Sequence, residues 1–228
     1  MGACGIVTSP SILLVHGMWG DGSFWNRFRR RFERDGFNSS PITLVHHDTP
    51  QDLHGLRHAG IMNYVAQVRE AVRGCPEPPV VVGHSMGALV AQKVAEAVVL
   101  KGLVLLSPVP PAGISPIRPS VLMTMGANLP DALLSRPFRI PWRNARYGLF
   151  NTLPPREQVV VYRSFLYESG RVLWQILRGG VSVAERNMSC PVLVGVGSED
   201  RATPPPIARR IAFKYGADFH EYPGECHY

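Results

Sequence analysis

Signals for a membrane, a secretory route or a disulfide scaffold are missing from this chain of 228 residues. No apolar run approaches the roughly 18 residues that indicate a membrane span, so we expect none. Residues 1–6 have neither a basic region nor a long apolar region, and so do not resemble a secretory signal. The four cysteines are scattered without a C-x-x-C pair. We therefore expect reduced thiols and a cytoplasmic protein.

Motifs for nucleic acid and for metal are lacking as well. The net charge is +7, but no basic run interleaves with aromatic residues. The excess of basic over acidic residues lies mostly within residues 112–187, where the arginines are widely spaced. This pattern favours a solvated basic surface over a nucleic-acid partner, with a preference for anionic substrates as the weaker alternative. His46, His47, His54 and His58 have no metal-ligand spacing, and we interpret them as polar and exposed. The sequence predicts neither a metal nor a cofactor.

The pattern that is present is an alternation of apolar strands and amphipathic helices. Apolar residues make up 45% of the chain, enough for one domain with an insertion. The alternation is typical of a mostly parallel sheet covered by helices on both faces, hence an α/β fold of about six strands. The predicted strands are residues 11–15, 42–45, 79–82, 103–106, 192–196 and 217–222.

The alternation breaks in the second half of the chain. There the sequence is rich in proline, arginine and aromatic residues and carries two or three helical pieces without a strand. We interpret residues 112–187 as a helical cap inserted into a core that consists of residues 1–111 and 188–228. Such an insertion is expected to lie over the strand ends where catalysis takes place.

The pentapeptide Gly83-His84-Ser85-Met86-Gly87 carries the most chemical information. It lies between an apolar β-branched run and an alanine-rich helical stretch. Gly-x-Ser-x-Gly in that context predicts a nucleophile elbow, a turn so sharp that its flanking residues must be small. The elbow would present Ser85 above the sheet, turn His84 away from it, and aim the Met86 N–H at the reacting oxygen.

A serine hydroxyl needs a base, and histidine titrates in the right range. His227 is favoured because it lies on a loop directly after the last predicted strand. The base needs a carboxylate partner, and the loop after the fifth strand offers Asp200 and Glu199, of which Asp200 is preferred. The alternative for Asp200 is a helix N-terminal charge beside Thr203, a predicted N-cap. The order serine, acid, histidine is the one expected for this architecture.

The loop after the first strand, His16-Gly17-Met18-Trp19-Gly20-Asp21-Gly22, is rich in glycine. Its backbone can approach a substrate closely, and the Met18 N–H is the natural second donor to an oxyanion, beside that of Met86. We expect His16 to order this loop by hydrogen bonding.

These residues together resemble the α/β-hydrolase superfamily, in its serine esterase and lipase-like branch. The resemblance covers residues 11–227. It is carried by His16-Gly17, Gly83 to Gly87, Gly197 to Pro204 and His227. It implies a parallel sheet with a variable cap, Asp200 as the acid, no cofactor and, most often, ester hydrolysis.

The sequence departs from that family in two places. The usual first two strands are missing, and the chain ends at Tyr228, one residue after the proposed base. Family members usually continue with a helix that packs on the sheet. We therefore expect exposed apolar surface and a poorly anchored His227 loop.

The predicted activity is hydrolysis of small apolar carboxylic esters through an acyl-enzyme. Trp19, Met123, Phe138 and Trp142 are the predicted substrate-binding residues, with ordinary cap packing as the alternative. Carbon–carbon bond hydrolysis, lactone hydrolysis and perhydrolysis use the same triad and stay open. A non-catalytic ligand-binding protein is the alternative from another class, and a homo-oligomer is left open.

Overall fold

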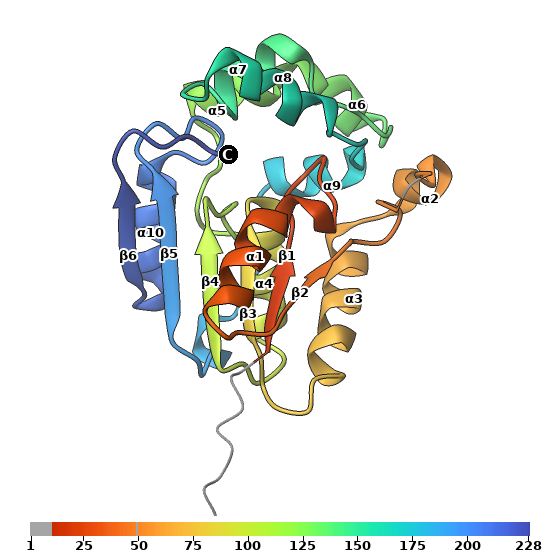
Figure 1. Cartoon of the computed structure of the whole chain (residues 1–228). Helices are drawn as coiled ribbons and strands as arrows, with labels where there is room; N and C mark the ends of the chain where they lie inside the picture. The colour runs from red at the N-terminus through yellow and green to blue at the C-terminus, as the bar shows by residue number, and fades with distance from the viewer. Residues whose placement is uncertain (1–10, 49) are drawn as a thin grey trace, which may run out of the picture.

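The computed structural model describes residues 11–48 and 50–228. Its centre is a six-stranded sheet in the order β2-β1-β3-β4-β5-β6, in which every neighbouring pair is parallel (Figure 1). The strands are β1 (Ile12–Val15), β2 (Ser39–Ile42), β3 (Val80–His84), β4 (Gly102–Leu106), β5 (Val192–Gly197) and β6 (Asp218–Tyr222). The predicted α/β class is confirmed.

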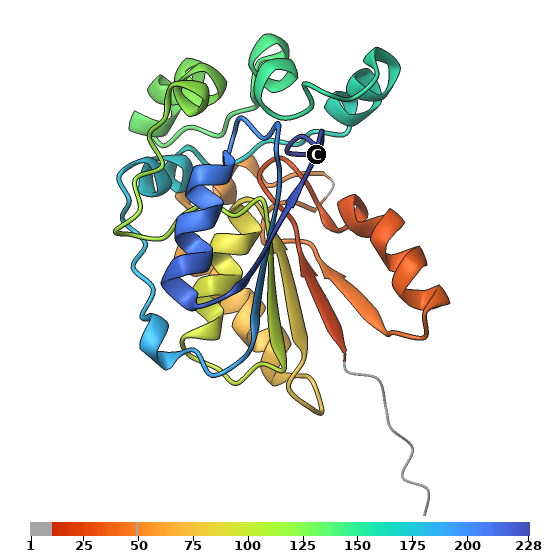
Figure 2. The same cartoon turned by 90° about the vertical axis from the view of Figure 1, so that its left-hand side faces the viewer.

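Helices pack on the two faces of the sheet unequally (Figure 2). One face is covered by α3 (Ile61–Arg73), α4 (Met86–Ala95) and α10 (Pro205–Tyr215). The main hydrophobic cluster lies there, because these helices turn their apolar stripes toward the strands. The other face carries the 3₁₀ turn η1 (Gly22–Trp25) and α1 (Asn26–Arg34) over a small cluster around Leu14, Trp25 and Val82.

The second strand is three residues earlier than predicted. The apolar run 42–45 suggested a strand, but the chain pairs with β1 through Ser39–Ile42, with Ile12 opposite Ser39. Beyond Ile42, backbone groups bond side chains instead of β1. The Leu44 N–H donates to His16 Nε2 (3.0 Å) and the Val45 N–H donates to Gln67 Oε1 (2.9 Å). Hydrogen bonds to side chains from distant parts of the sequence therefore keep residues 43–45 out of the sheet.

The long segment between β4 and β5 forms most of the helices above the sheet. The helices α5 (Pro119–Met125), α6 (Leu129–Leu133), α7 (Trp142–Gly148) and α8 (Pro155–Arg163) lie over the carboxyl ends of the strands (Figure 1). The following helix, α9 (Gly170–Leu177), returns to the core, where Gln175 Oε1 accepts from the Ile61 N–H (2.9 Å). The short helix α2 (Leu53–His58) and the 3₁₀ turns η2 (Gly126–Asn128) and η3 (Glu185–Asn187) complete the described chain.

Apolar surface is exposed on the α1 side of the sheet. Beside α1, a hollow of about 380 Å³ is lined in part by Phe28, Leu106 and Tyr222, and Tyr222 is 49% exposed. Among residues 11–48 and 50–228, no helix has the length and apolar character to span a bilayer.

Candidate active site

The turn from β3 to α4 places Ser85 at the carboxyl edge of the sheet. Ser85 has a positive φ of 54° with ψ −118°, a strained backbone for a residue with a Cβ. The turn is held by the Ser85 N–H, which donates to Leu106 O (2.9 Å). The flanking glycines are sterically required, because a Cβ at Gly83 would lie 2.5 Å from Gly87 O and a Cβ at Gly87 would lie 2.3 Å from His16 O. The predicted sharp turn is therefore present.

Substitution of Gly87 by alanine is expected to destabilise the fold by roughly 1–3 kcal/mol or more, because the new methyl group would overlap backbone atoms that cannot move independently. Thermal unfolding followed by circular dichroism measures the effect. Gly126→Ala is the matched control, since a methyl group added there would have no neighbour within 4 Å. Equal melting temperatures for Gly87→Ala and the unchanged protein would contradict the steric argument.

His84 is turned toward the α1 side of the sheet edge. Its ring stacks on Phe24 (4.9 Å between centroids), and its Nε2 donates to His227 O (2.9 Å). Burial, together with the nearby His227, lowers the pKa of His84 to about 3. His84 is therefore a neutral hydrogen-bond donor that ties the elbow to the chain end.

Asp200 and His227 meet at the same edge. His227 Nδ1 lies 2.8 Å from Asp200 Oδ2, and both side chains are buried. The N–H groups of Ala202 and Thr203 donate to Asp200 Oδ1 (2.9 and 2.8 Å). Burial alone would raise the pKa of Asp200, but His227 and these hydrogen bonds outweigh it and lower the pKa. The carboxylate is thus held ionised, with one oxygen committed to the backbone and the other facing the imidazole.

Two neighbours of Asp200 take other roles. Glu199 is exposed, and its backbone N–H donates to Glu225 O (2.9 Å). Thr203 was expected to be a helix N-cap, but Pro204 holds that position. The Thr203 hydroxyl instead lies 2.8 Å from Ser107 O and 3.0 Å from Asp200 Oδ2. Thr203 therefore helps to hold the carboxylate instead of starting α10.

The His227 loop is anchored more firmly than expected. A Cβ at Gly197 would lie 2.2 Å from Glu225 O, so the loops after β5 and β6 are in direct backbone contact. The Gly224 N–H donates to Ser198 Oγ (2.9 Å), and His84 holds the His227 carbonyl. His227 is only 5% exposed. Contacts with the elbow and with the loop after β5 therefore hold the His227 loop in place.

The glycine-rich loop after β1 lies against the serine. A Cβ at Gly17 would be 2.9 Å from Ser85 Cβ, a close approach that glycine alone permits. His16 orders this loop as expected, because its Nε2 accepts from the Leu44 N–H (3.0 Å) and its Nδ1 lies 2.8 Å from Gly17 O. The N–H groups of Met18 and Met86 donate to no other described residue, so both are available to an incoming oxygen.

Ser85 Oγ makes no hydrogen bond to His227 within the part of the chain that the structure describes. The structure thus places Asp200 and His227 in contact and Ser85 at the same edge of the sheet, without a hydrogen bond between Ser85 and His227. Catalytic hydrogen bonds are often long or poorly aligned without substrate and tighten in the reacting complex.

The four predicted substrate-binding residues lie in different surroundings. Trp19 and Phe138 are buried and pack edge to face (5.8 Å between centroids). Trp142 is half-buried and packs on Tyr162 (5.1 Å), whereas Met123 is 58% exposed on α5. Trp19 and Trp142 line two separate cavities.

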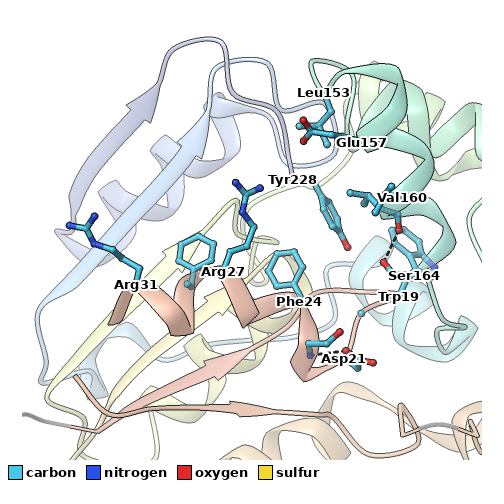
Figure 3. A pocket seen from close by; sticks show the side chains of 14 residues that line it. Trp19, Asp21, Phe24, Arg27, Arg31, Leu153, Glu157, Val160, Ser164 and Tyr228 are labelled. Carbon is cyan, nitrogen blue, oxygen red and sulfur yellow. Dashed lines mark hydrogen bonds between the residues drawn. The ribbon is translucent and has the colours of Figure 1, made fainter. Parts of the chain in front are cut away.

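A cavity of about 630 Å³ opens between α1 and α8 (Figure 3). Its wall includes Trp19 from the loop after β1 and Tyr228, the residue after His227. Figure 3 shows Tyr228 between Phe24 and Val160, with Arg27 nearby. Ser85 and His227 do not line it. The sequence does not single out Phe24, Val160 or Tyr228 as lining residues, because contacts between α1, α8 and the chain end leave no local signal.

One interpretation of the histidines is wrong. His47 is fully buried rather than exposed, and its Nε2 lies 3.2 Å from Oε2 of Glu168, which is also fully buried. A carboxylate 121 positions away in the sequence allows this burial, and no local pattern could reveal it. Among the described residues, no group of three histidine, cysteine, aspartate or glutamate side chains is arranged to hold a metal ion.

Comparison with solved structures shows the same fold in proteins of low sequence identity. An extracellular alpha/beta-hydrolase from a Paenibacillus species, described as sharing structural and functional homology with tobacco salicylic acid binding protein 2, has a TM-score of 0.75 at 17% identity, over 96% of this chain and 91% of that one. Polyneuridine aldehyde esterase has a TM-score of 0.70 at 16% identity, over 96% of this chain and 92% of that one.

A third solved structure is a bromoperoxidase-like protein, BpoC from Mycobacterium tuberculosis. It has a TM-score of 0.73 at 19% identity, over 96% of this chain and 85% of that one. No curated protein matches the sequence. The model of the "Alpha/beta hydrolase family" matches residues 12–227, which include the elbow, the loop after β5 and His227. This protein belongs to the alpha/beta hydrolase family.

Proposed function

We propose that this protein is a serine hydrolase that cleaves small carboxylic esters through an acyl-enzyme. The observation that carries the proposal is the buried hydrogen bond between Asp200 and His227 at the sheet edge where the elbow presents Ser85. An ionised acid, an imidazole and a strained serine are the three parts of a nucleophilic triad.

In the proposed reaction, Ser85 Oγ attacks the ester carbonyl while His227 Nε2 takes its proton. Asp200 accepts the hydrogen bond of His227 Nδ1–H and stabilises the imidazolium. The N–H groups of Met18 and Met86 bind the oxyanion of the tetrahedral intermediate. His227 then protonates the departing alcohol, and water attacks the acyl-enzyme with His227 again as the base.

The surroundings of the site support an apolar substrate. Aromatic rings pack near residues 16–22, which we call the oxyanion loop, and near Tyr228. Phe165 lies between Trp19 (5.8 Å between centroids) and Tyr228 (5.5 Å). The cavity beside them has a largely apolar wall that includes Phe24, Leu153 and Val160. We propose that acyl or alcohol groups of modest size enter from this side. An esterase among the structural neighbours is in keeping with this class of substrate.

Two measurements test the proposal on the purified protein. A panel of p-nitrophenyl esters of increasing acyl length should be hydrolysed above the buffer rate, whereas lactones and dienoic ketones should react more slowly. A fluorophosphonate should give one covalent adduct, located at Ser85 by peptide mass spectrometry. Binding of esters without turnover, or an adduct at another residue, would contradict the proposal.

A further inference from the structure

A buried polar cluster that the proposed reaction does not use connects the segment before α9 to the core. Glu168 precedes α9 and is fully buried together with His47 and Tyr64. Its Oε1 accepts from the Tyr64 hydroxyl (2.8 Å) and from the Ser169 N–H (2.7 Å), while its Oε2 faces His47 Nε2 (3.2 Å). Every oxygen of this buried carboxylate therefore has a partner, which is the condition for burying a charge.

With Glu168 ionised, the hydrogen-bond geometry requires a positive charge on His47. Its Nδ1 lies 3.1 Å from Val45 O, and its Nε2 faces Glu168 Oε2. Both partners are acceptors when Glu168 is ionised, so both ring nitrogens must be protonated. Burial alone would lower the pKa of His47, but the Glu168 carboxylate outweighs it and raises the pKa. Burial would raise the pKa of Glu168, and His47 with the other donors lowers it instead.

This ion pair lies directly beside the histidine that orders the oxyanion loop. The rings of His16 and His47 meet edge to face, 5.3 Å between centroids. His16 Nε2 accepts a backbone N–H, so the proton of its neutral ring must be on Nδ1, which donates to Gly17 O. Burial and the neighbouring His47 charge lower the pKa of His16 to about 4, which keeps that tautomer in place.

A second contact fixes the other side of the same loop. The Leu166 N–H, two residues before Glu168, donates to Trp19 O (2.8 Å). Trp19 has a positive φ of 63°, a disfavoured backbone conformation that persists only where surrounding contacts hold it, and this hydrogen bond is one such contact. Met18, the proposed oxyanion donor, thus lies between Gly17, held through His16, and Trp19, held through Leu166.

We propose that Glu168 and His47 are positioning residues: their buried ion pair seats residues 165–169 on the core and thereby aims the Met18 N–H at the reacting oxygen. The role in catalysis depends on the proposed serine hydrolase activity, whereas the seating does not. Neither residue lines the α1–α8 cavity. An error of about 1 Å in an oxyanion donor is enough to lower a rate about 100-fold.

Glu168→Gln is the decisive variant, because it removes the charge and leaves every hydrogen bond possible. The amide oxygen would take the place of Oε1, which accepts two bonds, so the amide NH₂ would face His47 Nε2. His47 would then be neutral, with its proton on Nδ1. We expect kcat on a p-nitrophenyl ester to fall about 10- to 100-fold with KM within about twofold.

The pH dependence separates positioning from simple packing. The groups that face His47 are Glu168, Tyr64 and His16. Because the folded pKa of His47 is raised, the stability from the pair is full below the ordinary histidine pKa and is lost as pH rises through the folded value. The melting temperature and kcat should therefore fall together at alkaline pH, and Glu168→Gln should lack this shared alkaline decline.

Hydrogen exchange gives a readout that needs no activity. In Glu168→Gln the amides of Leu44, which donates to His16, and of Leu166, which donates to Trp19, should exchange at least about tenfold faster, while those of β3 stay unchanged. Glu185→Gln is the matched control, since it removes a carboxylate from an exposed pair with Lys214. Tyr64→Phe, which removes one donor and no charge, should have a smaller effect than Glu168→Gln.

Each outcome decides one of the two proposals. Unchanged exchange at Leu44 and Leu166 in a folded Glu168→Gln protein would overturn the positioning role. Equal changes in kcat, pH profile and exchange for Glu185→Gln would overturn it as well. If the unchanged protein hydrolyses no ester and takes no fluorophosphonate, the proposed function fails. The exchange data and the alkaline melting profile then still decide whether the pair seats this segment.

Discussion

Replacement of Ser85 by alanine should lower kcat for a p-nitrophenyl ester by about 10⁴-fold or more, to the rate that binding and the oxyanion donors alone support. The reason is that the acyl group then has no attachment point, and Met18 and Met86 can only polarise a carbonyl that water attacks slowly. Steady-state kinetics and loss of the fluorophosphonate adduct measure the effect.

Stability should be nearly unchanged in Ser85→Ala. The Ser85 hydroxyl bonds no other described residue, so removing it leaves no buried group unpaired. Ser115→Ala is the control, because this exposed hydroxyl accepts only the Ile117 N–H (3.3 Å) and lies outside the α1–α8 cavity. Retained turnover in Ser85→Ala at an unchanged melting temperature would mean that another group is the nucleophile.

Replacement of Asp200 by asparagine should lower kcat by about 10⁴-fold, nearly as much as loss of the serine. The structure determines how the amide would lie. Two backbone N–H groups donate to Oδ1, so the amide oxygen must take that place and the NH₂ must face His227 Nδ1. The amide then donates to Nδ1, the His227 proton moves to Nε2, and the imidazole can no longer accept the serine proton.

The neighbouring carboxylate provides the control for this experiment. Glu199→Gln should leave kcat within about twofold, because the Glu199 side chain is exposed and only its backbone bonds the His227 loop. The pKa of Asp200 is lowered, so its contribution to stability is present at neutral pH and is lost as pH falls through the folded value. Asp200→Asn should therefore flatten the acid side of the melting profile. Equal kcat losses for the two variants would contradict the assignment of Asp200.

Most of the fold could be predicted because each parallel strand leaves a local trace. The strands around Val80–His84 and Val192–Gly197 are apolar on both faces, and helices with one apolar stripe follow them. The edge strand β2 was predicted three residues too late, since its position depends on backbone hydrogen bonds donated to His16 and Gln67 rather than on hydropathy. An edge strand with Pro41 has little sequence signal.

The candidate site was partly predictable for a similar reason. Steric contacts require glycine two positions before and two positions after Ser85, at Gly83 and Gly87. The elbow is therefore a local sequence motif. Asp200 and His227 could be selected because parallel strands deliver their following loops to one edge. The wall of the α1–α8 cavity could be predicted only in part. Trp19 lies in this wall, whereas Phe138 is a buried packing residue, and the remaining wall comes from α1, α8 and Tyr228, which leave no local signal.

By itself, the sequence determined the parallel sheet, the strained serine turn and the chain order of serine, acid and base. Each follows from hydropathy, glycine sterics and the direction of parallel strands, which act over a few residues. Only the tertiary structure decided that His47 is buried with Glu168, that Thr203 bonds the acid instead of capping a helix, and that the last loop is held by its neighbours. The reason is that a buried polar group is stable only with its partner in place, and the partner can come from anywhere in the chain.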